Sequence, residues 1–262
     1  MTARAWSGFE CRGIGLRYVG RNADVTALED VSFGVDDGEF VCLVGPSGCG
    51  KTTLLKIVAG LLEPTLGEIV FRSPNGRPRT GLVFQEHGVF PWMSVLDNVA
   101  FGLEMRGVSR RERRERARAF IEQAGLGAFA ESFPHELSVG MRQRVGIARA
   151  FVTDVPILLM DEPFGSLDAQ SKRVLQEELL RVWRNHRKIV LYVTHDIEEA
   201  VLLGDRVLVM TGRPGRIREE IRVPLARPRE PSLAEERTVL QIKWHVWRLL
   251  EHEVRRGLSI AG

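Results

Sequence analysis

The sequence predicts an α/β protein whose core is a parallel β-sheet, interrupted by a block of helices. Short apolar runs that are typical of buried strands alternate with longer segments of helical periodicity. Residues 40–44 are almost wholly apolar, as expected for a strand that is buried on both faces of a parallel sheet. Between about 94 and 153 only helical patterns occur, so we expect this block to be an insertion into the α/β core.

Composition places the chain among ordinary globular proteins. It has 262 residues, of which 44% are hydrophobic and 27% charged. Residues 1–13 lack the apolar core of a signal peptide, and no apolar run approaches the roughly 18 residues that span a bilayer. The net charge of +3 is small and spread out, so we expect no nucleic-acid contact. The chain itself is therefore expected to stay in the cytoplasm.

The first part of the chain predicts strands around one helix. Residues 14–19 and 31–35 alternate apolar and polar positions, as half-buried strands do. After the buried strand, residues 51–59 have the pattern of a helix that stops before a glycine. Shorter strands are expected at 69–71 and 81–84.

The helical block contains three expected helices, at 95–105, 110–124 and 138–152. Ser94 and Ser109 are good N-caps for the first two. The second helix is rich in arginine, which invites a nucleic-acid interpretation. Glutamates interleave with the arginines at helical spacing, so we interpret this surface as a solvated helix face.

Strands return after the block and alternate with helices. Strands are expected at 157–160, 189–193 and 206–210, with helices at 169–186 and 196–203 between them. This alternation is what predicts a parallel sheet covered on both faces.

The chain ends in an amphipathic helix that follows a proline-marked stretch. We favour docking of this helix on the core, and contact with a partner chain is the alternative. Its apolar stripe consists of Val239, Ile242, Val246, Leu249 and Leu250.

A glycine-rich loop carries the clearest chemistry. The segment Gly45-Pro46-Ser47-Gly48-Cys49-Gly50-Lys51-Thr52 fits the phosphate-loop pattern G-x-x-x-x-G-K-[ST] completely, and it stands between an apolar strand and a helix. Its glycines allow backbone N–H groups to approach a phosphate, and the helix N-terminus adds positive potential. Lys51 is expected to contact the β- and γ-phosphates, with Thr53 in the same nucleotide site. The Thr52 hydroxyl is the expected Mg²⁺ ligand. The loop predicts binding of a nucleoside triphosphate.

Two carboxylates follow the apolar run 157–160. Asp161 and Glu162 stand at the carboxyl end of this strand, where ligands bind in parallel sheets. We expect Asp161 to hold Mg²⁺ through water and Glu162 to be the general base that orients the attacking water.

The segment Leu137-Ser138-Val139-Gly140-Met141-Arg142-Gln143-Arg144 resembles the signature motif of ABC-transporter ATPases. Other motifs of that family occur in the same order along the chain, and the resemblance covers roughly residues 9–215. By this resemblance Gln85 is the Q-loop glutamine, Ser166-Leu167-Asp168 the D-loop, His195 the switch histidine and Tyr18 the aromatic that stacks on adenine.

The resemblance implies a P-loop NTPase fold. We expect a RecA-like parallel-sheet core, an antiparallel β subdomain and an inserted helical subdomain at about 90–153. The ATPase domain should cover 9–222, and 223–262 should form a C-terminal helical extension. The expected activity is hydrolysis of ATP with Mg²⁺.

The resemblance also implies a head-to-tail dimer, formed with a second copy or a paired ABC subunit. Each ATP would lie between Lys51 of one subunit and Ser138 and Gly140 of the other, with Asp168 also acting across the dimer. His195 would touch the γ-phosphate and position Glu162. The resemblance assigns Mg²⁺ to three residues, Thr52, Gln85 and Asp161.

Two positions require separate expectations. The family usually has glycine where this chain has Val139, and a β-branched residue is costly at positive φ. We therefore expect an ordinary negative φ at Val139, with slower or weaker dimerisation as the alternative. Cys49, inside the loop, is expected to be exposed near a helix N-terminus, with a lowered pKa and a reactive thiol.

Segments 85–104, 162–168 and 210–215 resemble the nitrate, sulfonate and taurine importers among ABC proteins. The implied partners are a transmembrane permease and, indirectly, an extracytoplasmic solute-binding protein. The implied location is the cytoplasmic face of the cell membrane, as a peripheral subunit. The alternative is a soluble ABC ATPase acting on nucleic acid or ribosomes. The transported solute is not encoded, because this subunit should never touch it.

Overall fold

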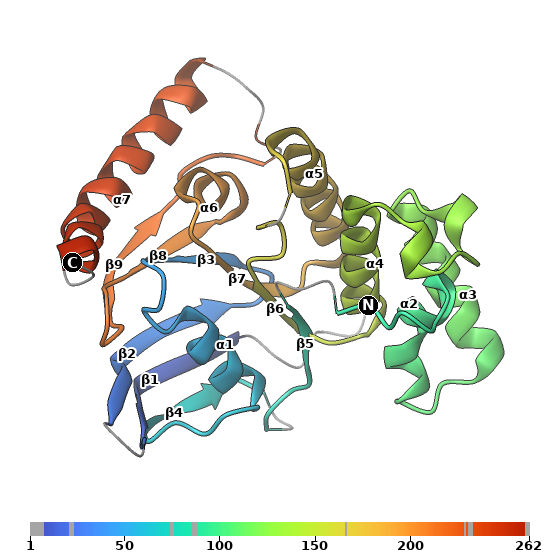
Figure 1. Cartoon of the computed structure of the whole chain (residues 1–262), viewed down its shortest axis with the longest axis horizontal. Coiled ribbons are helices and arrows are strands. Elements are labelled where there is room, and N and C mark those ends of the chain that lie inside the picture. Colours follow the sequence, from blue (N-terminus) through green and yellow to red (C-terminus); the bar gives the residue numbers. More distant parts are fainter. Residues whose placement is uncertain are drawn as a thin grey trace. The chain divides into compact units, whose positions relative to one another are not determined.

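The computed structural model describes residues 8–20, 24–73, 76–84, 88–165, 167–227, 229 and 233–259 (Figure 1). The chain divides into two units. Unit 1 comprises Met1–Pro78 and Ile189–Gly262, and unit 2 comprises Arg79–Lys188. The division into 9–222 and 223–262 stays a prediction. Among the described residues, no helix is long and apolar enough to cross a membrane.

Unit 1 contains a three-stranded antiparallel sheet of β1(Gly8–Tyr18), β2(Val25–Asp36) and β4(Leu66–Phe71). β1 lies in the middle and pairs with both neighbours. The strands are longer than the predicted 14–19, 31–35 and 69–71, because ladder pairing continues through register shifts that break the apolar alternation. Phe9 is fully buried and packs its ring against Phe33 and Phe71.

Unit 1 also contains a parallel group of strands. β3(Phe40–Val44) pairs in parallel with β7(Ile189–Thr194) on one side and with β8(Arg206–Met210) on the other. Every residue of β3 and β7 is buried, as the apolar runs predict. β9(Ile217–Arg222) adds an antiparallel strand beside β8. The sequence pattern does not predict β9, because its mostly charged residues resemble a loop and only its pairing reveals the strand.

Two short helices of unit 1 follow strands of the parallel group. α1(Lys51–Ala59) comes after β3 and the glycine-rich loop, and it ends at Gly60, whose N–H donates to the carbonyl of Ile57. α6(Ile197–Leu203) comes after β7 and is capped by Asp196, which accepts hydrogen bonds from two amides of its first turn.

The C-terminal helix α7(Leu233–Ser259) contacts α6 and β8, and Figure 1 shows it running beside them. Its side chains Ile242, Val246 and Leu250 are buried. Several polar contacts also join the same helix to the rest of unit 1. Lys243 pairs with Glu198 at 2.5 Å, and His245 lies 2.7 Å from Glu219. The favoured docking of this helix on the core is therefore confirmed.

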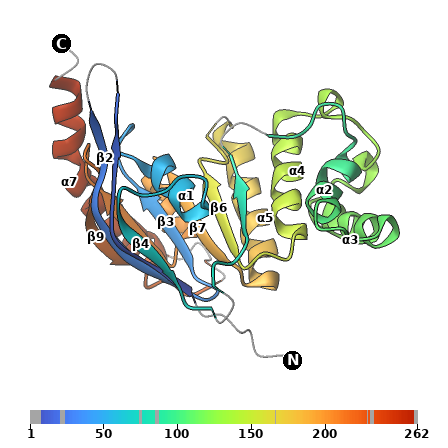
Figure 2. The same cartoon turned by 90° about the horizontal axis from the view of Figure 1, so that it is seen from below.

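Unit 2 combines two parallel strands with a helical bundle. β5(Thr80–Val83) and β6(Ile157–Asp161) pair in parallel. The helices are α2(Val95–Glu104), α3(Arg110–Gln123), α4(Val139–Val152) and α5(Ala169–His186), with short 3₁₀ turns at Gly127–Phe129 and Pro134–Glu136. Figure 2 shows α2, α3 and α4 gathered together, and their apolar faces share one buried cluster that includes Val99, Ile121 and Val145. The predicted helical block is present.

Candidate nucleotide-binding site

The phosphate loop joins β3 to α1 in unit 1. Gly48 and Gly50 have φ of 73° and 105°, values that side chains rarely adopt. At Gly50 a Cβ would also lie 2.7 Å from Leu28, so both the backbone conformation and the lack of space require glycine there. Lys51 is buried, and its ammonium donates to the carbonyls of Gly45 and Pro46 at 2.8 and 2.9 Å. The loop therefore presents one positive charge together with the N-terminus of α1.

The hydroxyl residues of the loop lie at its surface. Ser47 and Thr52 are exposed, and Thr53 is half-buried. The hydroxyl of Tyr18, at the end of β1, lies 3.4 Å from the Thr53 hydroxyl. Tyr18 is 45% exposed, so its ring is accessible beside the first turn of α1. The structure therefore places Tyr18 beside the start of α1, which directly follows the phosphate loop.

Cys49 contradicts its sequence-based expectation. The side chain is buried rather than exposed, with its sulfur 3.8 Å from the Lys51 ammonium. Burial raises the pKa of the Cys49 thiol, and the nearby charge of Lys51 only opposes that effect. The expectation of an exposed thiol with a lowered pKa is wrong, because the side chain is buried beside Gly45.

His195 follows β7 in unit 1 and is exposed. The residues on either side of it are held by a buried network. The Thr194 hydroxyl donates to Glu199 and accepts from the N–H of Asp196 at 3.0 Å. Tyr192 donates to the other oxygen of Glu199 at 2.8 Å. The backbone that carries His195 is thus fixed from both sides, a contribution that the sequence pattern does not reveal.

The acidic pair lies at the end of β6 in unit 2. Asp161 is the last residue of the strand and is buried. Glu162 is half-buried and has a φ of 44°, in the left-handed region. Its carbonyl accepts a hydrogen bond from the N–H of Gly165 at 3.1 Å, which closes a turn around it. A non-glycine residue in this region is uncommon and is often found at functional sites.

The signature segment begins α4 in unit 2. Ser138 is the N-cap, and its hydroxyl accepts from the N–H of Met141 at 3.3 Å. Val139 is the first helical residue and is not among the described non-glycine residues with positive φ, so the expected negative φ is confirmed. A Cβ at Gly140 would reach only Leu175, at 4.0 Å. Ser138 and Val139 are exposed, which leaves this helix start open to a ligand.

Asp168 is the N-cap of α5. Its carboxylate accepts from the N–H groups of Ser171 and Gln170 at 3.0 and 3.1 Å, and these bonds lower the pKa of Asp168. Two other candidates, Gln85 and Ser166, lie outside the described residues.

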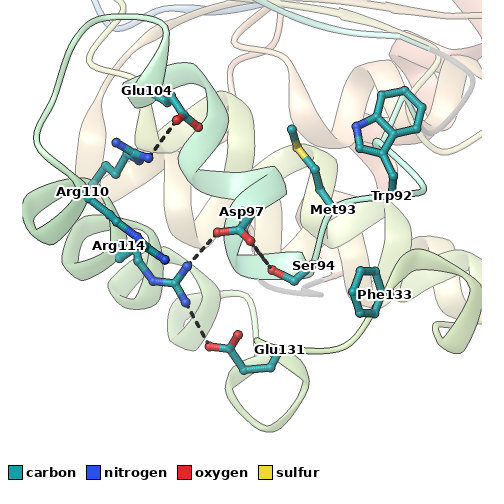
Figure 3. A pocket seen from close by; sticks show the side chains of 10 residues that line it. Trp92, Met93, Ser94, Asp97, Glu104, Arg110, Arg114, Glu131 and Phe133 are labelled. Atoms are coloured by element: carbon teal, nitrogen blue, oxygen red, sulfur yellow. Dashed lines mark hydrogen bonds and ion pairs between the residues drawn. The ribbon is translucent and has the colours of Figure 1, made fainter.

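A cleft of about 630 Å³ opens on the helical part of unit 2. Figure 3 shows Arg114 between two carboxylates, at 2.8 Å from Asp97 and 3.4 Å from Glu131. Trp92 and Phe133 add aromatic surface to its lining, and both are exposed. The cleft therefore offers charged and aromatic groups to the same ligand.

A phosphate loop on a parallel sheet, with an acidic strand end and a capped signature helix, defines an ATP-binding cassette. The ABC transporter family model matches residues 28–165, and the chain belongs to this family. The predictions of the family, of the α/β fold with its antiparallel sheet and helices, and of ATP hydrolysis are confirmed.

Relatives cover most of the chain. An uncharacterized ABC transporter ATP-binding protein of Methanocaldococcus jannaschii is 46% identical over 90% of this chain and 88% of its own length. The nitrate import ATP-binding protein NrtD of Synechocystis is 45% identical over 79% of each chain. The taurine import ATP-binding protein TauB of Rhizobium johnstonii is 51% identical over 74% of this chain and 75% of its own.

Solved structures agree with this assignment. The dimeric post-hydrolysis state of the ATP-binding cassette MJ0796, bound to ADP and Pi, superposes with a TM-score of 0.71 and 32% identity. The match covers 82% of this chain and 98% of the solved chain.

Proposed function

We propose that the chain hydrolyses ATP to energise an ABC importer for nitrate, sulfonate, taurine or a similar small organic solute. The observation that carries the proposal is the phosphate loop, with buried Lys51 at the start of α1. Relatives named as nitrate and taurine import proteins support the importer assignment. The relatives described above carry no nucleic-acid function in their names, so the alternative gains no support.

The phosphate loop would bind the triphosphate through charge and backbone donors. The Lys51 ammonium would contact the β- and γ-phosphates, and the N–H groups at the start of α1 would face the phosphate oxygens. Tyr18 is exposed beside Thr53, which leaves its ring accessible for stacking on adenine. Binding would thus use residues from β1, the loop and α1.

Oxygen donors suited to Mg²⁺ are present. The Thr52 hydroxyl is exposed, and the Asp161 carboxylate stands at a strand end, which are ligand types that this ion prefers. When bound, Mg²⁺ would neutralise charge on the β- and γ-phosphates. Gln85 remains a proposed third ligand.

Glu162 and His195 are the proposed catalytic residues beside Lys51. Glu162 would accept the proton of the attacking water and orient it toward the γ-phosphorus. His195 would contact the γ-phosphate, with its backbone held by Thr194 and Asp196. The left-handed conformation of Glu162 supports a functional role, because such a backbone is normally avoided.

The active form is proposed to be a head-to-tail dimer. The exposed Ser138 and the helix start at Gly140 would complete the ATP site of the other subunit, and Asp168 would act across the same interface. A helix N-terminus with open N–H groups is a suitable anion site for a γ-phosphate. The bridging phosphate is the differential contact by which ATP would close the dimer.

The proposed membrane partner is a permease, which would hold this subunit at the cytoplasmic face of the membrane. The cleft on the helical part of unit 2, with Trp92, Phe133 and the Arg114 ion pairs, would receive a cytoplasmic helix of the permease. The solute-binding protein would act from the other side of the membrane and would not touch this chain.

Reconstitution tests the proposal. The chain, its permease and the binding protein would be assembled in liposomes, and ATP hydrolysis measured with nitrate, taurine and alkanesulfonates. We expect one solute class to stimulate hydrolysis severalfold. Stimulation by DNA or ribosomes, with none by any solute-loaded binding protein, would support the nucleic-acid alternative.

A further inference from the structure

The segment 211–215, between β8 and β9, packs directly on the phosphate loop. The Arg213 guanidinium donates to the carbonyl of Gly48, with its Nε and Nη2 at 3.4 and 3.2 Å. A Cβ on Gly215 would lie only 2.1 Å from the carbonyl oxygen of Cys49, so the two backbones are in contact. The hydrogen bond joins positions 165 residues apart.

The same segment is fastened to β2. The N–H of Gly215 donates to the carbonyl of Ala27 at 2.9 Å, and its carbonyl accepts from the N–H of Glu29 at 3.0 Å. Arg216 also pairs with the Glu29 carboxylate at 2.7 Å, but both side chains are about half exposed, so the backbone hydrogen bonds carry the attachment. Arg213 is therefore presented to the loop from a fixed backbone.

The hydrogen bond to Gly48 has a consequence for the peptide that follows. In a trans peptide the carbonyl and the N–H point in opposite directions, so Arg213 also fixes the N–H of Cys49. The N–H of Cys49 also donates to the carbonyl of Pro46, but at 3.4 Å this hydrogen bond is long. Gly48 has a φ of 73° and carries no Cβ. The charged donor on the Gly48 carbonyl therefore adds to the restraint on this peptide.

The C-terminal helix contacts the segment 211–215 at Gly212, the residue before Arg213. Glu253 of α7 accepts a hydrogen bond from the N–H of Gly212 at 3.0 Å. The helix is anchored by the buried Val246 and by the pair of Lys243 with Glu198. Its packing therefore reaches the phosphate loop through Gly212 and Arg213.

We propose that Arg213 is a positioning residue for the phosphate loop and that Glu253 couples the C-terminal helix to it. The inference rests on the proposed role of residues 45–52 in triphosphate binding. Arg213 acts through the backbone of the loop, so its loss should raise KM for ATP and leave kcat nearly unchanged.

The test measures the Kd for ATP with Mg²⁺ and the hydrolysis kinetics of the full chain. We expect about fivefold weaker binding for Arg213→Ala, which corresponds to about 1 kcal/mol, the central value for one hydrogen bond. Arg213→Lys should weaken ATP binding by about half as much in free energy as Arg213→Ala does, because one donor remains. Glu253→Ala should weaken binding about threefold, whereas Glu253→Gln keeps an acceptor for Gly212 and should bind like the parent.

Matched controls remove the same charge nearby. Arg216→Ala lies in the same turn and pairs with Glu29, and Glu251→Ala lies on the same helix and pairs with Arg255. Both should bind ATP like the parent. The thermal midpoint without nucleotide should fall no further for Arg213→Ala than for Arg216→Ala. In the double variant of Arg213 and Glu253, binding should match Arg213→Ala alone, because both residues act through one segment.

Two outcomes separate this inference from the proposed function. Lys51→Ala should lose ATP binding. Parent-like binding by that variant would show that residues 45–52 are not the nucleotide site. If Lys51→Ala loses binding while Arg213→Ala stays within twofold of Arg216→Ala, the positioning role of Arg213 is overturned. Parent-like binding by Glu253→Ala overturns the role of the helix.

Discussion

Glu162 combines a proposed catalytic role with a backbone conformation that costs free energy. Its φ of 44° lies where side chains crowd the backbone, and the turn closed by Gly165 holds it there. From the sequence Cys49 is expected to be reactive, but its thiol is buried and its raised pKa keeps it neutral. At the scale of single residues, local burial and dihedral angle decide what a motif position does.

Glu162→Gln is expected to abolish ATP turnover and to retain ATP binding. The amide keeps the size of the side chain but cannot accept the proton of the attacking water. Single-turnover hydrolysis and the Kd for ATP would be measured together. Glu177→Gln, at an exposed position on α5 that pairs with Arg173, is the control and should hydrolyse normally. Normal turnover in the Glu162→Gln variant would show that Glu162 is not the general base.

Cys49 is expected to resist alkylation in the native protein at pH 7. Its raised pKa keeps the thiol neutral through this range, and only the thiolate reacts. Labelling should be at least about tenfold slower than after unfolding in urea, and should rise with pH. Mass spectrometry of the peptide containing Cys49 measures both rates. Equal rates in the folded and unfolded protein would show that the side chain is accessible.

Capping organises the elements of the proposed site. Ser138, Asp168 and Asp196 each begin a helix by accepting hydrogen bonds from amides of its first turn. At α4 this arrangement leaves Val139 at the first helical position with a helical backbone. The element therefore accommodates valine at this position with an ordinary helical backbone.

Val139→Gly is expected to lower stability slightly without raising hydrolysis. The native φ suits valine, so glycine relieves no strain and costs roughly 0.3–0.5 kcal/mol of helix propensity relative to valine. Thermal unfolding and steady-state hydrolysis would be compared with Val139→Ala. A severalfold gain in hydrolysis for the glycine variant alone would show that valine slows dimerisation.

At the scale of the whole molecule, the proposed ATP site requires two chains. Lys51 belongs to the phosphate loop, and Ser138 would serve the loop of the partner. A two-fold symmetric dimer then contains two equivalent composite sites. Two variants that are each defective in a different half of the site should therefore regain activity when they are mixed.

Lys51→Ala and Ser138→Ala are each expected to be inactive alone and partly active together. In a mixed dimer one site contains both substitutions and the other contains neither. Random exchange should restore roughly a quarter of the parent's sites, since half of the dimers are mixed. Hydrolysis would be measured after exchange, which differently tagged chains verify by copurification. No recovery in verified mixed dimers would contradict the head-to-tail site.

Much of the fold and of the candidate site could be predicted because their signals are local. The phosphate loop is contiguous, and its pattern of glycines, Lys51 and Thr52 states its chemistry directly. The strands at 40–44 and 189–193 are apolar throughout because both of their faces are buried. β9 escapes prediction because its charged residues carry no apolar alternation, and only pairing with β8 makes it a strand.

The sequence by itself determined the family, the parallel sheet, the helical block and the candidate residues of the ATP site. Tertiary structure alone decided the burial of Cys49 and the left-handed backbone of Glu162, and it confirmed the docking of α7 that the sequence favoured. It also decided that Arg213 reaches Gly48 across 165 positions and that Glu253 holds Gly212. The physical reason is that motifs follow from neighbours in the chain, whereas burial and hydrogen bonds between distant segments depend on how those segments pack.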